Sequence, residues 1–184
     1  PGLGGHCIPV DPIFLAWKMK TLQYRTRFIE LAAEVHGEMP RWVVERTAEA
    51  MNDARKPLNG SDVLVLGVSY KPDGDEVRES PAIDIRKILR QRGANVEFHD
   101  PFVSVLEIDG DPEQSVELTA ERLERADAVV ITTDHSMVDY GLVGLHASIM
   151  VDPRNAMTES SGAVVYPIAG PPRAPGSSSL PDPT

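Results

Sequence analysis

The segment VLVLGV (63–68) is a short apolar run in which valine and leucine alternate, and it follows a turn-forming Asn-Gly pair at 59–60. Such a run is typical of a strand buried on both faces, as strands of parallel sheets are. Downstream, Ser80 and Pro81 form an N-cap and first-residue pair that predicts the start of a helix. This helix is expected to end just before Gly93, a residue suited to the position after a C-cap. The segment therefore predicts the first strand of a strand–helix unit.

The alternation of strands and helices continues toward the carboxyl terminus. Strands are expected at 96–99, 127–133 and 148–152, with helices near 117–125 and 139–145. This order predicts an α/β fold with a doubly wound parallel sheet, which binds ligands beyond the carboxyl ends of its strands. The residues expected at those ends are 69–73, 99–100, 132–135 and 152–155.

The residues before this unit follow helical patterns. Asp11 and Pro12 predict the N-cap and first residue of a helix that runs to about Lys20. A second helix is expected over 26–36, and the pattern resumes at Pro40, which either opens a new helix or kinks one long helix. Too few apolar residues surround these helices to bury their apolar faces. We therefore expect them to pack on another part of a longer chain or on a second subunit.

Composition limits the possible functions. The 184 residues carry a formal net charge of −10, which excludes the basic surface that nucleic-acid backbones require. No apolar run approaches the roughly 18 residues of a membrane span, and no signal peptide is evident. A single cysteine excludes an internal disulfide, so the reducing cytoplasm is the expected location. An anionic ligand would have to be held by a few well-placed cations.

The opening segment, PGLGGHCIPVDP (1–12), contains the only cysteine. Gly4 and Gly5 would let the backbone approach a ligand closely, which gives access to the thiol of Cys7. The alternative is an inert buried cysteine. The expected capping role of Asp11 leaves room for a second role, because a carboxylate has two oxygens.

The segment GVSYKPDGDEVRESPA (67–82) supplies candidate cations. Lys71 precedes a proline and is held extended at the exit of the first strand, unless it is only a solvated charge. Arg78 lies just before a helix N-terminus, where amide groups favour anions, or it pairs with an acidic neighbour. Arg154 follows the last predicted strand at the same edge, unless it forms a surface salt bridge. No G-x-G-x-x-G follows the first strand, so this sheet is not expected to be the cofactor-binding half. No histidine lies in a zinc-binding motif, so we expect no metal site.

Four motifs together resemble the UDP-glucose/GDP-mannose dehydrogenase superfamily, and most closely its bacterial UDP-N-acetylglucosamine 6-dehydrogenases. They are GGHCIPVDP (4–12), TRFIELA (26–32), GVSYKPDGDEVRESPA (67–82) and VDPRN (151–155). The resemblance covers about residues 1–155, and the motifs occur in the family's order. It implies the carboxyl-terminal part of an enzyme whose NAD-binding domain lies upstream, so the chain alone is expected to be inactive.

The resemblance also implies a domain organisation. Residues 1–56 would form the catalytic-cysteine loop and a central helical dimerisation segment, through which the protein forms a homodimer. Residues 57–168 would form a Rossmann-like UDP-sugar-binding domain. The proline- and serine-rich residues 169–184 are expected to be a disordered tail.

The activity that the resemblance implies is a two-step, NAD-dependent oxidation of C6 of a UDP-sugar to a uronic acid, a type of product that usually feeds surface polysaccharides. The thiolate of Cys7 would carry a thioester intermediate, and Asp11 would assist proton transfer and activate water. UDP-N-acetylglucosamine is the first candidate substrate, followed by UDP-N-acetylmannosamine and UDP-glucose. The resemblance assigns the substrate to Gly4, Gly5, Tyr70, Lys71 and Arg154, adds Arg27 from the neighbouring subunit, and places Arg78 on the NAD side.

The chain departs from the family pattern in a few places. Tyr70 replaces a more usual phenylalanine, Glu76 stands where aspartate is common, and His36 stands where asparagine usually occurs. The family's catalytic lysine, asparagine, threonine and glutamate would lie in a segment that this chain does not contain. A UDP-sugar-binding and dimerisation module without catalysis is therefore the alternative function.

Overall fold

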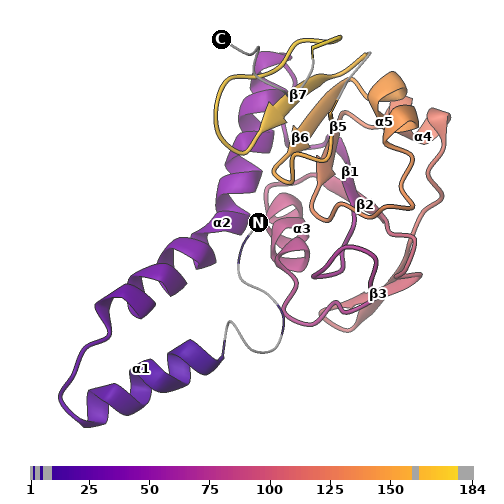
Figure 1. Cartoon of the computed structure of the whole chain (residues 1–184). Coiled ribbons are helices and arrows are strands. Elements are labelled where there is room, and N and C mark those ends of the chain that lie inside the picture. The colour runs from indigo at the N-terminus through magenta and orange to yellow at the C-terminus, as the bar shows by residue number, and fades with distance from the viewer. Residues whose placement is uncertain (1, 3–4, 6–9, 159–161, 178–184) are drawn as a thin grey trace.

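The computed structural model describes residues 2, 5, 10–158 and 162–177, and it contains a parallel five-stranded sheet with helices on both faces (Figure 1). The strand order is β2-β1-β5-β6-β7. This arrangement confirms the predicted α/β fold. The strands are β1 (Asp62–Leu66), β2 (Asn95–His99), β5 (Ala128–Ile131), β6 (Ile149–Asp152) and β7 (Val164–Pro167).

The two faces of β1 explain why the sheet is covered twice. Val63 and Val65 pack on one side with helices α2 (Arg27–Asp53) and α3 (Pro81–Gln91). Leu64 and Leu66 pack on the other side with α4 (Ala120–Arg125) and α5 (Tyr140–His146). Because successive side chains of a strand point to opposite faces, an unbroken apolar run is what a doubly covered strand requires.

The ends of α3 follow the sequence prediction. The hydroxyl oxygen of Ser80 accepts a hydrogen bond from the backbone N–H of Ala82 at 3.4 Å, and Pro81 is the first helical residue. Arg92 is the C-cap, and Gly93 after it has a φ of +87°, which glycine adopts without a steric penalty.

Pro40 lies inside one continuous helix, so it does not open a new helix, and the alternative of one long helix is the correct one. Helix α1 (Asp11–Thr21) also differs slightly from its prediction. Its N-cap is Val10, without a side-chain cap, so Asp11 is the first helical residue rather than the N-cap. A carboxylate in the first turn still favours the helix through its dipole.

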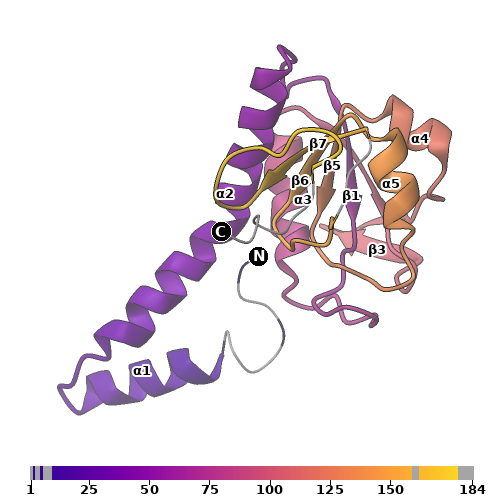
Figure 2. The same cartoon turned by 45° about the horizontal axis from the view of Figure 1, so that its top comes forward.

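Helix α1 and the first half of α2 form a helical arm that projects from the sheet (Figures 1 and 2). The arm exposes many large apolar side chains, and Phe28 is 88% accessible. The expectation that this chain alone cannot bury these helices is confirmed. The exposed large apolar residues along the arm are Val10, Ile13, Phe14, Leu15, Trp17, Leu22, Tyr24, Phe28, Leu31 and Val35, and Trp42 follows just beyond it on α2.

Two features of the fold are absent from the sequence prediction. The first is an antiparallel hairpin of β3 (Val105–Ile108) and β4 (Asp111–Gln114), and the second is strand β7. β4 has the sequence DPEQ, which is polar and contains proline, so it lacks the alternation that marks a half-buried strand.

The residues after β7 differ from the disordered tail predicted over 169–184. Arg173 forms an antiparallel bridge with Val165, and Arg46 of α2 donates to the carbonyl oxygens of Pro167 at 3.0 Å and Gly170 at 2.6 Å. Backbone pairing and arginine hydrogen bonds thus order residues 168–177 despite their proline and glycine content. Residues 178–184 lie outside the described part.

Candidate functional site

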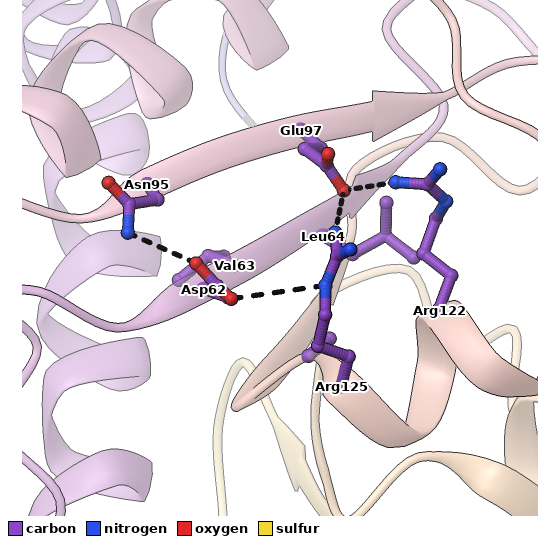
Figure 3. A pocket seen from close by; sticks show the side chains of 8 residues that line it. Asp62, Val63, Leu64, Asn95, Glu97, Arg122 and Arg125 are labelled. Atoms are coloured by element: carbon purple, nitrogen blue, oxygen red, sulfur yellow. Dashed lines mark hydrogen bonds and ion pairs between the residues drawn. The ribbon is translucent and has the colours of Figure 1, made fainter.

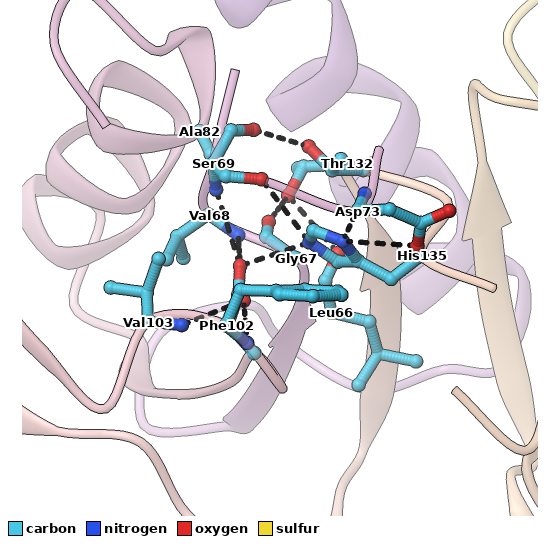
Figure 4. A network of polar contacts seen from close by, with 12 residues as sticks. Leu66, Gly67, Val68, Ser69, Asp73, Ala82, Phe102, Val103, Thr132 and His135 are labelled. Atoms are coloured by element: carbon cyan, nitrogen blue, oxygen red, sulfur yellow. Dashed lines mark hydrogen bonds and ion pairs between the residues drawn. The ribbon is translucent and has the colours of Figure 1, made fainter. Parts of the chain in front are cut away.

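The carboxyl ends of β1, β2 and β5 meet at one edge of the sheet (Figure 4). Gly67, just after β1, has a φ of +77°, and a Cβ there would lie 2.4 Å from the carbonyl oxygen of Thr133. The Gly67 N–H donates to the carbonyl of His99 at 2.9 Å. Only glycine permits this close approach, which brings the strand exits together.

Asp100 is the buried hub of this edge. Its Oδ2 accepts from the backbone N–H of Val68 at 2.7 Å and of Ser69 at 3.2 Å, while its Oδ1 accepts from Phe102 at 2.8 Å. Burial by itself raises the pKa of this carboxyl, but hydrogen bonds from His135 and the backbone outweigh it and lower the pKa to about 2. Asp100 is therefore a carboxylate that fixes the strand exits.

The loop after β1 presents Tyr70 and Lys71 at this edge. The Tyr70 N–H donates to the carbonyl of Glu76 at 2.7 Å, and the Ser69 hydroxyl donates to the carbonyl of Lys71 at 2.8 Å. The Lys71 ammonium lies 5.8 Å from the centroid of the Tyr70 ring. Lys71 is exposed and forms no ion pair with any residue that the structure describes. It is a cation free to meet an anionic ligand.

The opening segment reaches the same edge. Gly5 is buried with a φ of +78°, and a Cβ on it would lie 2.5 Å from Cε1 of Tyr70. Gly2 lies near the start of α3, where a Cβ on it would be 3.0 Å from the Cβ of Pro81. The predicted site residues Gly4 and Cys7 lie outside the described residues. Asp11 is exposed at the start of α1.

Arg154 lies at the exit of β6 on the same edge, and its Nε donates to Asp134 Oδ1 at 2.9 Å. The salt bridge that the sequence left as an alternative is thus present. Asp152 supports this turn, because its Oδ1 accepts from the Arg154 N–H at 3.1 Å and its Oδ2 from the Met157 N–H at 2.8 Å. The guanidinium is exposed and keeps its other nitrogens for a ligand.

The other two predicted cations lie differently. Arg78 is exposed shortly before α3, and its Nε is 3.9 Å from Glu76 Oε1, so it has the acidic neighbour considered from the sequence. Arg27 is the first residue of α2, where it is exposed on the helical arm. The structure therefore gathers Gly5, Tyr70, Lys71 and Arg154 at the sheet edge and leaves Arg27 on the arm.

A second group of charges surrounds a small cavity of about 70 Å³ at the start of β1 and along β2 (Figure 3). Arg122 and Arg125 both pair with Glu97, at 2.5 and 3.0 Å. Arg125 also lies 4.0 Å from Asp62, which accepts a hydrogen bond from Asn95 at 3.0 Å. Because both cations are already paired, this cluster is better explained as structural than as an anion site.

The buried network of Ser69, Asp100, Thr133 and His135 was not identified from the sequence. All four residues lie at strand ends that the sequence marked as the ligand edge, which was the available signal. Within the described residues, no group of three histidine, cysteine or acidic side chains is placed to hold a metal ion. None of the helices described combines the length and apolarity that crossing a membrane requires.

A doubly wound parallel sheet with free and ligand-accessible cations at its carboxyl edge defines a nucleotide-binding type of α/β domain. Residues 64–159 match the UDP binding domain of the UDP-glucose/GDP-mannose dehydrogenase family, and residues 1–37 match the family's central domain. The chain belongs to the UDP-glucose/GDP-mannose dehydrogenase family.

Individual relatives agree with this assignment. An NDP-N-acetyl-D-galactosaminuronic acid dehydrogenase from Ralstonia solanacearum is 37% identical over 138 residues, which are 73% of this chain and 30% of the relative. A UDP-N-acetyl-D-glucosamine 6-dehydrogenase from Pseudomonas aeruginosa is 33% identical over 56% of this chain and 25% of its own length. The structure of a UDP-D-ManNAc dehydrogenase from Pyrococcus horikoshii superimposes with a TM-score of 0.76 at 29% identity, covering 91% of this chain and 38% of that chain. This chain thus spans about a third of such relatives.

Proposed function

We propose that this chain is the carboxyl-terminal part of an NAD-dependent 6-dehydrogenase that oxidises C6 of a UDP-N-acetylhexosamine to the uronic acid in two steps. The observation that carries the proposal is the contact between Gly5 and Tyr70. Gly5 lies two residues before Cys7 in sequence, so its contact with Tyr70 supports the proposal that Cys7 acts close to the loop that presents Lys71. A nucleophile and a cation for a diphosphate are then available at one edge of a nucleotide-binding sheet.

In this proposal Cys7 is the nucleophile. Its thiolate adds to the C6 aldehyde that the first oxidation produces, which forms a C–S bond, and the former carbonyl oxygen takes up a proton. Loss of hydride from C6 and of the hydroxyl proton leaves a thioester, and attack by water breaks the C–S bond to release carboxylate and thiol. Asp11 assists these proton transfers and the activation of water. NAD⁺ supplies the hydride acceptor for both oxidations.

Lys71 and Arg154 are proposed to bind the diphosphate, with Tyr70 packing on the nucleotide-sugar and Gly4 and Gly5 allowing close backbone approach. Arg154 is held in place by Asp134 at 2.9 Å, and its free nitrogens suit a phosphate because a guanidinium binds oxygens in a fork. Lys71 forms no ion pair with any described residue, so no ion pair has to be broken before it binds phosphate. Two cations at one edge satisfy the requirement that the net charge of −10 imposes.

Few residues in this chain are suited to hold NAD. The connection from β1 to α3 has no glycine-rich dinucleotide loop, and Arg78 is the residue that we assign to the NAD side. Its exposed guanidinium close to the amino end of α3 fits an approach by an anionic group. The rest of the cofactor site is proposed to lie in another part of a longer polypeptide, so the chain alone should not reduce NAD⁺.

The helical arm is proposed to form the homodimer. Pro12, Ile13, Phe28 and Ala32 line an apolar groove between α1 and α2. A second copy would cover this apolar surface, and Arg27, next to Phe28, would then be available to the neighbouring subunit's substrate. The proposed enzyme is cytoplasmic, and its uronic acid product feeds surface polysaccharides.

The substrate order stays UDP-N-acetylglucosamine, then UDP-N-acetylmannosamine, then UDP-glucose. Relatives whose names refer to N-acetylated sugars support the first two, since UDP-N-acetyl-D-mannosamine and UDP-N-acetyl-D-glucosamine dehydrogenases both match. A UDP-glucose dehydrogenase from Pyrobaculum islandicum, with a TM-score of 0.72 at 28% identity, keeps the third in consideration. The alternative function is a UDP-sugar-binding and dimerisation module without catalysis.

Calorimetric titration with UDP tests the site. Lys71→Ala should weaken binding about tenfold or more, because a hydrogen bond to a charged group contributes roughly 1.5–3 kcal/mol. Lys87→Ala is the matched control, since Lys87 is already paired with Asp109 at 2.6 Å. Equal affinity of the Lys71 variant and the wild type would contradict the placement of the site.

A second experiment separates the enzyme from the binding module. In the full-length protein, Cys7→Ser should keep UDP-sugar binding and abolish uronate formation. Uronate formation at the wild-type rate by this variant would overturn the thioester mechanism. If the full-length wild type binds UDP but forms no uronate from any of the three sugars, the binding module is the correct function.

A further inference from the structure

We infer that His135 is a positioning residue, which holds the loop that presents Tyr70 and Lys71 in its ligand-binding shape. The importance of this loop for the ligand rests on the proposed function. The hydrogen bonds that fix the loop stand independently of it. His135 follows β5, lies far from the loop in sequence, and is fully buried beneath the sheet edge (Figure 4).

The hydrogen bonds of His135 define its protonation pattern. The backbone N–H of Asp73 donates to His135 Nδ1 at 2.9 Å. A backbone N–H can only donate, so Nδ1 must accept and carries no proton. Nε2 then carries the proton, and it lies 3.1 Å from Asp100 Oδ2 and 3.2 Å from the Ser69 hydroxyl oxygen. The ring is thus a neutral histidine with one donor and one acceptor, both in use.

These contacts hold the loop on both sides of Lys71. On one side, Ser69 contacts His135 and also donates to the Lys71 carbonyl at 2.8 Å. On the other side, the Asp73 N–H is bound by the ring, and Asp73 Oδ1 accepts from the N–H and hydroxyl of Ser136 at 2.8 and 2.9 Å. One residue, together with its sequence neighbour, therefore fixes both ends of the ligand-facing turn.

The backbone of Asp73 shows why such a restraint is needed. Its φ is +57°, a left-handed conformation that non-glycine residues adopt at a cost. The hydrogen bond that the Asp73 N–H donates to His135, and those that Asp73 Oδ1 accepts from Ser136, offset this cost. Without them we expect the turn to sample other conformations, and UDP would then have to order it on binding, which lowers affinity.

If His135 served only to pack the core, its shape would matter but its hydrogen-bonding groups would not. The His135 ring lies 5.1 Å from the ring of Phe102, so some of its surface fills the core. Packing depends on the volume of the side chain and hardly depends on which ring nitrogen accepts a hydrogen bond. The positioning role requires an acceptor where Nδ1 lies, and this difference can be tested with two amides.

The test compares His135→Asn with His135→Gln in the whole chain. The Asn amide oxygen can take the place of Nδ1 and accept from Asp73, while the Gln amide nitrogen can take the place of Nε2 and donate to Asp100. UDP affinity should stay within about threefold of wild type for Asn and fall about tenfold for Gln, the effect of one hydrogen bond of roughly 1.4 kcal/mol. His146→Asn is the control and should leave affinity unchanged, because His146 lies on α5 and its ring nitrogen contacts Glu124 of α4 rather than the ligand-facing loop.

Thermal unfolding of each variant separates positioning from stability. The inference is overturned if Asn and Gln lower affinity equally, or if affinity merely follows the unfolding temperature in both. If His135→Asn proves unstable, His135→Gln with near wild-type stability still decides, because unchanged UDP affinity in that variant also overturns the inference.

A ligand-free measurement makes failure of this inference distinguishable from failure of the proposed function. Nitrogen-15 NMR of the histidine rings should show His135 protonated at Nε2 alone, and the Asp73 amide should exchange slowly with solvent in wild type and faster in His135→Gln. A proton on Nδ1, or unchanged exchange in the variant, overturns the inference. If both signatures are found and wild type does not bind UDP, the proposed function fails while the restraint of the loop by His135 stands.

Discussion

Gly5 lies so close to Tyr70 that a Cβ on Gly5 would come within 2.5 Å of Cε1 of the ring. This contact joins the opening segment to the loop after β1, although the two are far apart in sequence. Lys71 is the next residue along that loop and has its ammonium 5.8 Å from the Tyr70 ring. The position of the proposed diphosphate-binding cation is thereby linked to the segment that carries Cys7.

Gly5→Ala should therefore lower both the stability of the fold and the affinity of the site for UDP. The φ of +78° disfavours alanine, and the added methyl would have to displace the body of the Tyr70 ring. We expect a loss of about 1–3 kcal/mol in the free energy of unfolding and a clear loss of UDP affinity. Urea unfolding and calorimetric titration measure the two effects.

Gly37→Ala is the matched control for that substitution. Gly37 lies inside α2, and a Cβ there would meet no atom within 4 Å. Alanine should stabilise the helix there by up to about 1 kcal/mol without changing UDP affinity. If the two glycine variants behave alike, the contact between Gly5 and Tyr70 is not important in solution.

The acidity of Asp100 predicts a pH dependence of stability. Its folded-state pKa is about 2, below the roughly 3.9 of an unfolded aspartate. Ionised Asp100 therefore contributes to the free energy of unfolding. This contribution is fully present above the pKa of the unfolded state and is lost as the pH falls through the pKa of the folded state. It amounts to about 2 kcal/mol.

Asp100→Asn isolates this contribution from those of other carboxylates. The variant should be less stable than wild type at pH 6, because its amide replaces a carboxylate that accepts several backbone hydrogen bonds. Its free energy of unfolding should fall less than that of wild type between pH 4.5 and 2, by about 2 kcal/mol. Parallel pH profiles of the two proteins would contradict the assigned role of Asp100.

Much of the fold was predictable because its strands are buried on both faces. Segments such as VLVLGV (63–68) carry enough consecutive apolar residues to be recognised without tertiary information. The hairpin of β3 and β4 was not, because Arg86 and Arg90 hold the polar strand β4 through Glu113. These ion pairs join residues distant in sequence, and no local pattern records them.

The candidate site, like the fold, was predictable from the sequence only in part. Topology places every parallel strand end at one edge, so the position of Lys71 and Arg154 could be predicted. The pairing of His135 with Asp100 and Asp73 could not, because it depends on how the loops fold back over the edge. The same holds for the salt bridge between Arg154 and Asp134.

Arg154→Ala should weaken UDP binding and reduce its dependence on salt. An arginine that binds a diphosphate contributes charge-assisted hydrogen bonds, so the loss should be about tenfold or more in Kd. Arg125→Ala is the matched control, since Arg125 belongs to the paired cluster near the start of β1 (Figure 3). Titrations at low and high salt measure both effects, and equal losses in the two variants would show a general charge effect instead of a site.

The apolar face of the helical arm predicts self-association. Phe28 is 88% accessible and lines an apolar groove between α1 and α2, so we expect a second copy to cover it. Burying a phenylalanine contributes roughly 1.5–3 kcal/mol, and a glutamate there would bring an unpaired charge into the interface. Phe28→Glu should therefore raise the dimer dissociation constant at least about tenfold.

Sedimentation equilibrium over a range of concentrations measures this change. Wild type should have twice the mass of one chain, and Phe28→Glu should shift toward one. Met137→Glu is the control, because Met137 is 69% accessible and lies between β5 and α5, away from the arm, so the same charge should leave the dimer intact. A wild-type protein that stays monomeric at all concentrations would leave the arm to be covered by another part of a longer chain. Equal dissociation of both variants would show that added negative charge, rather than the apolar face of α2, controls the association.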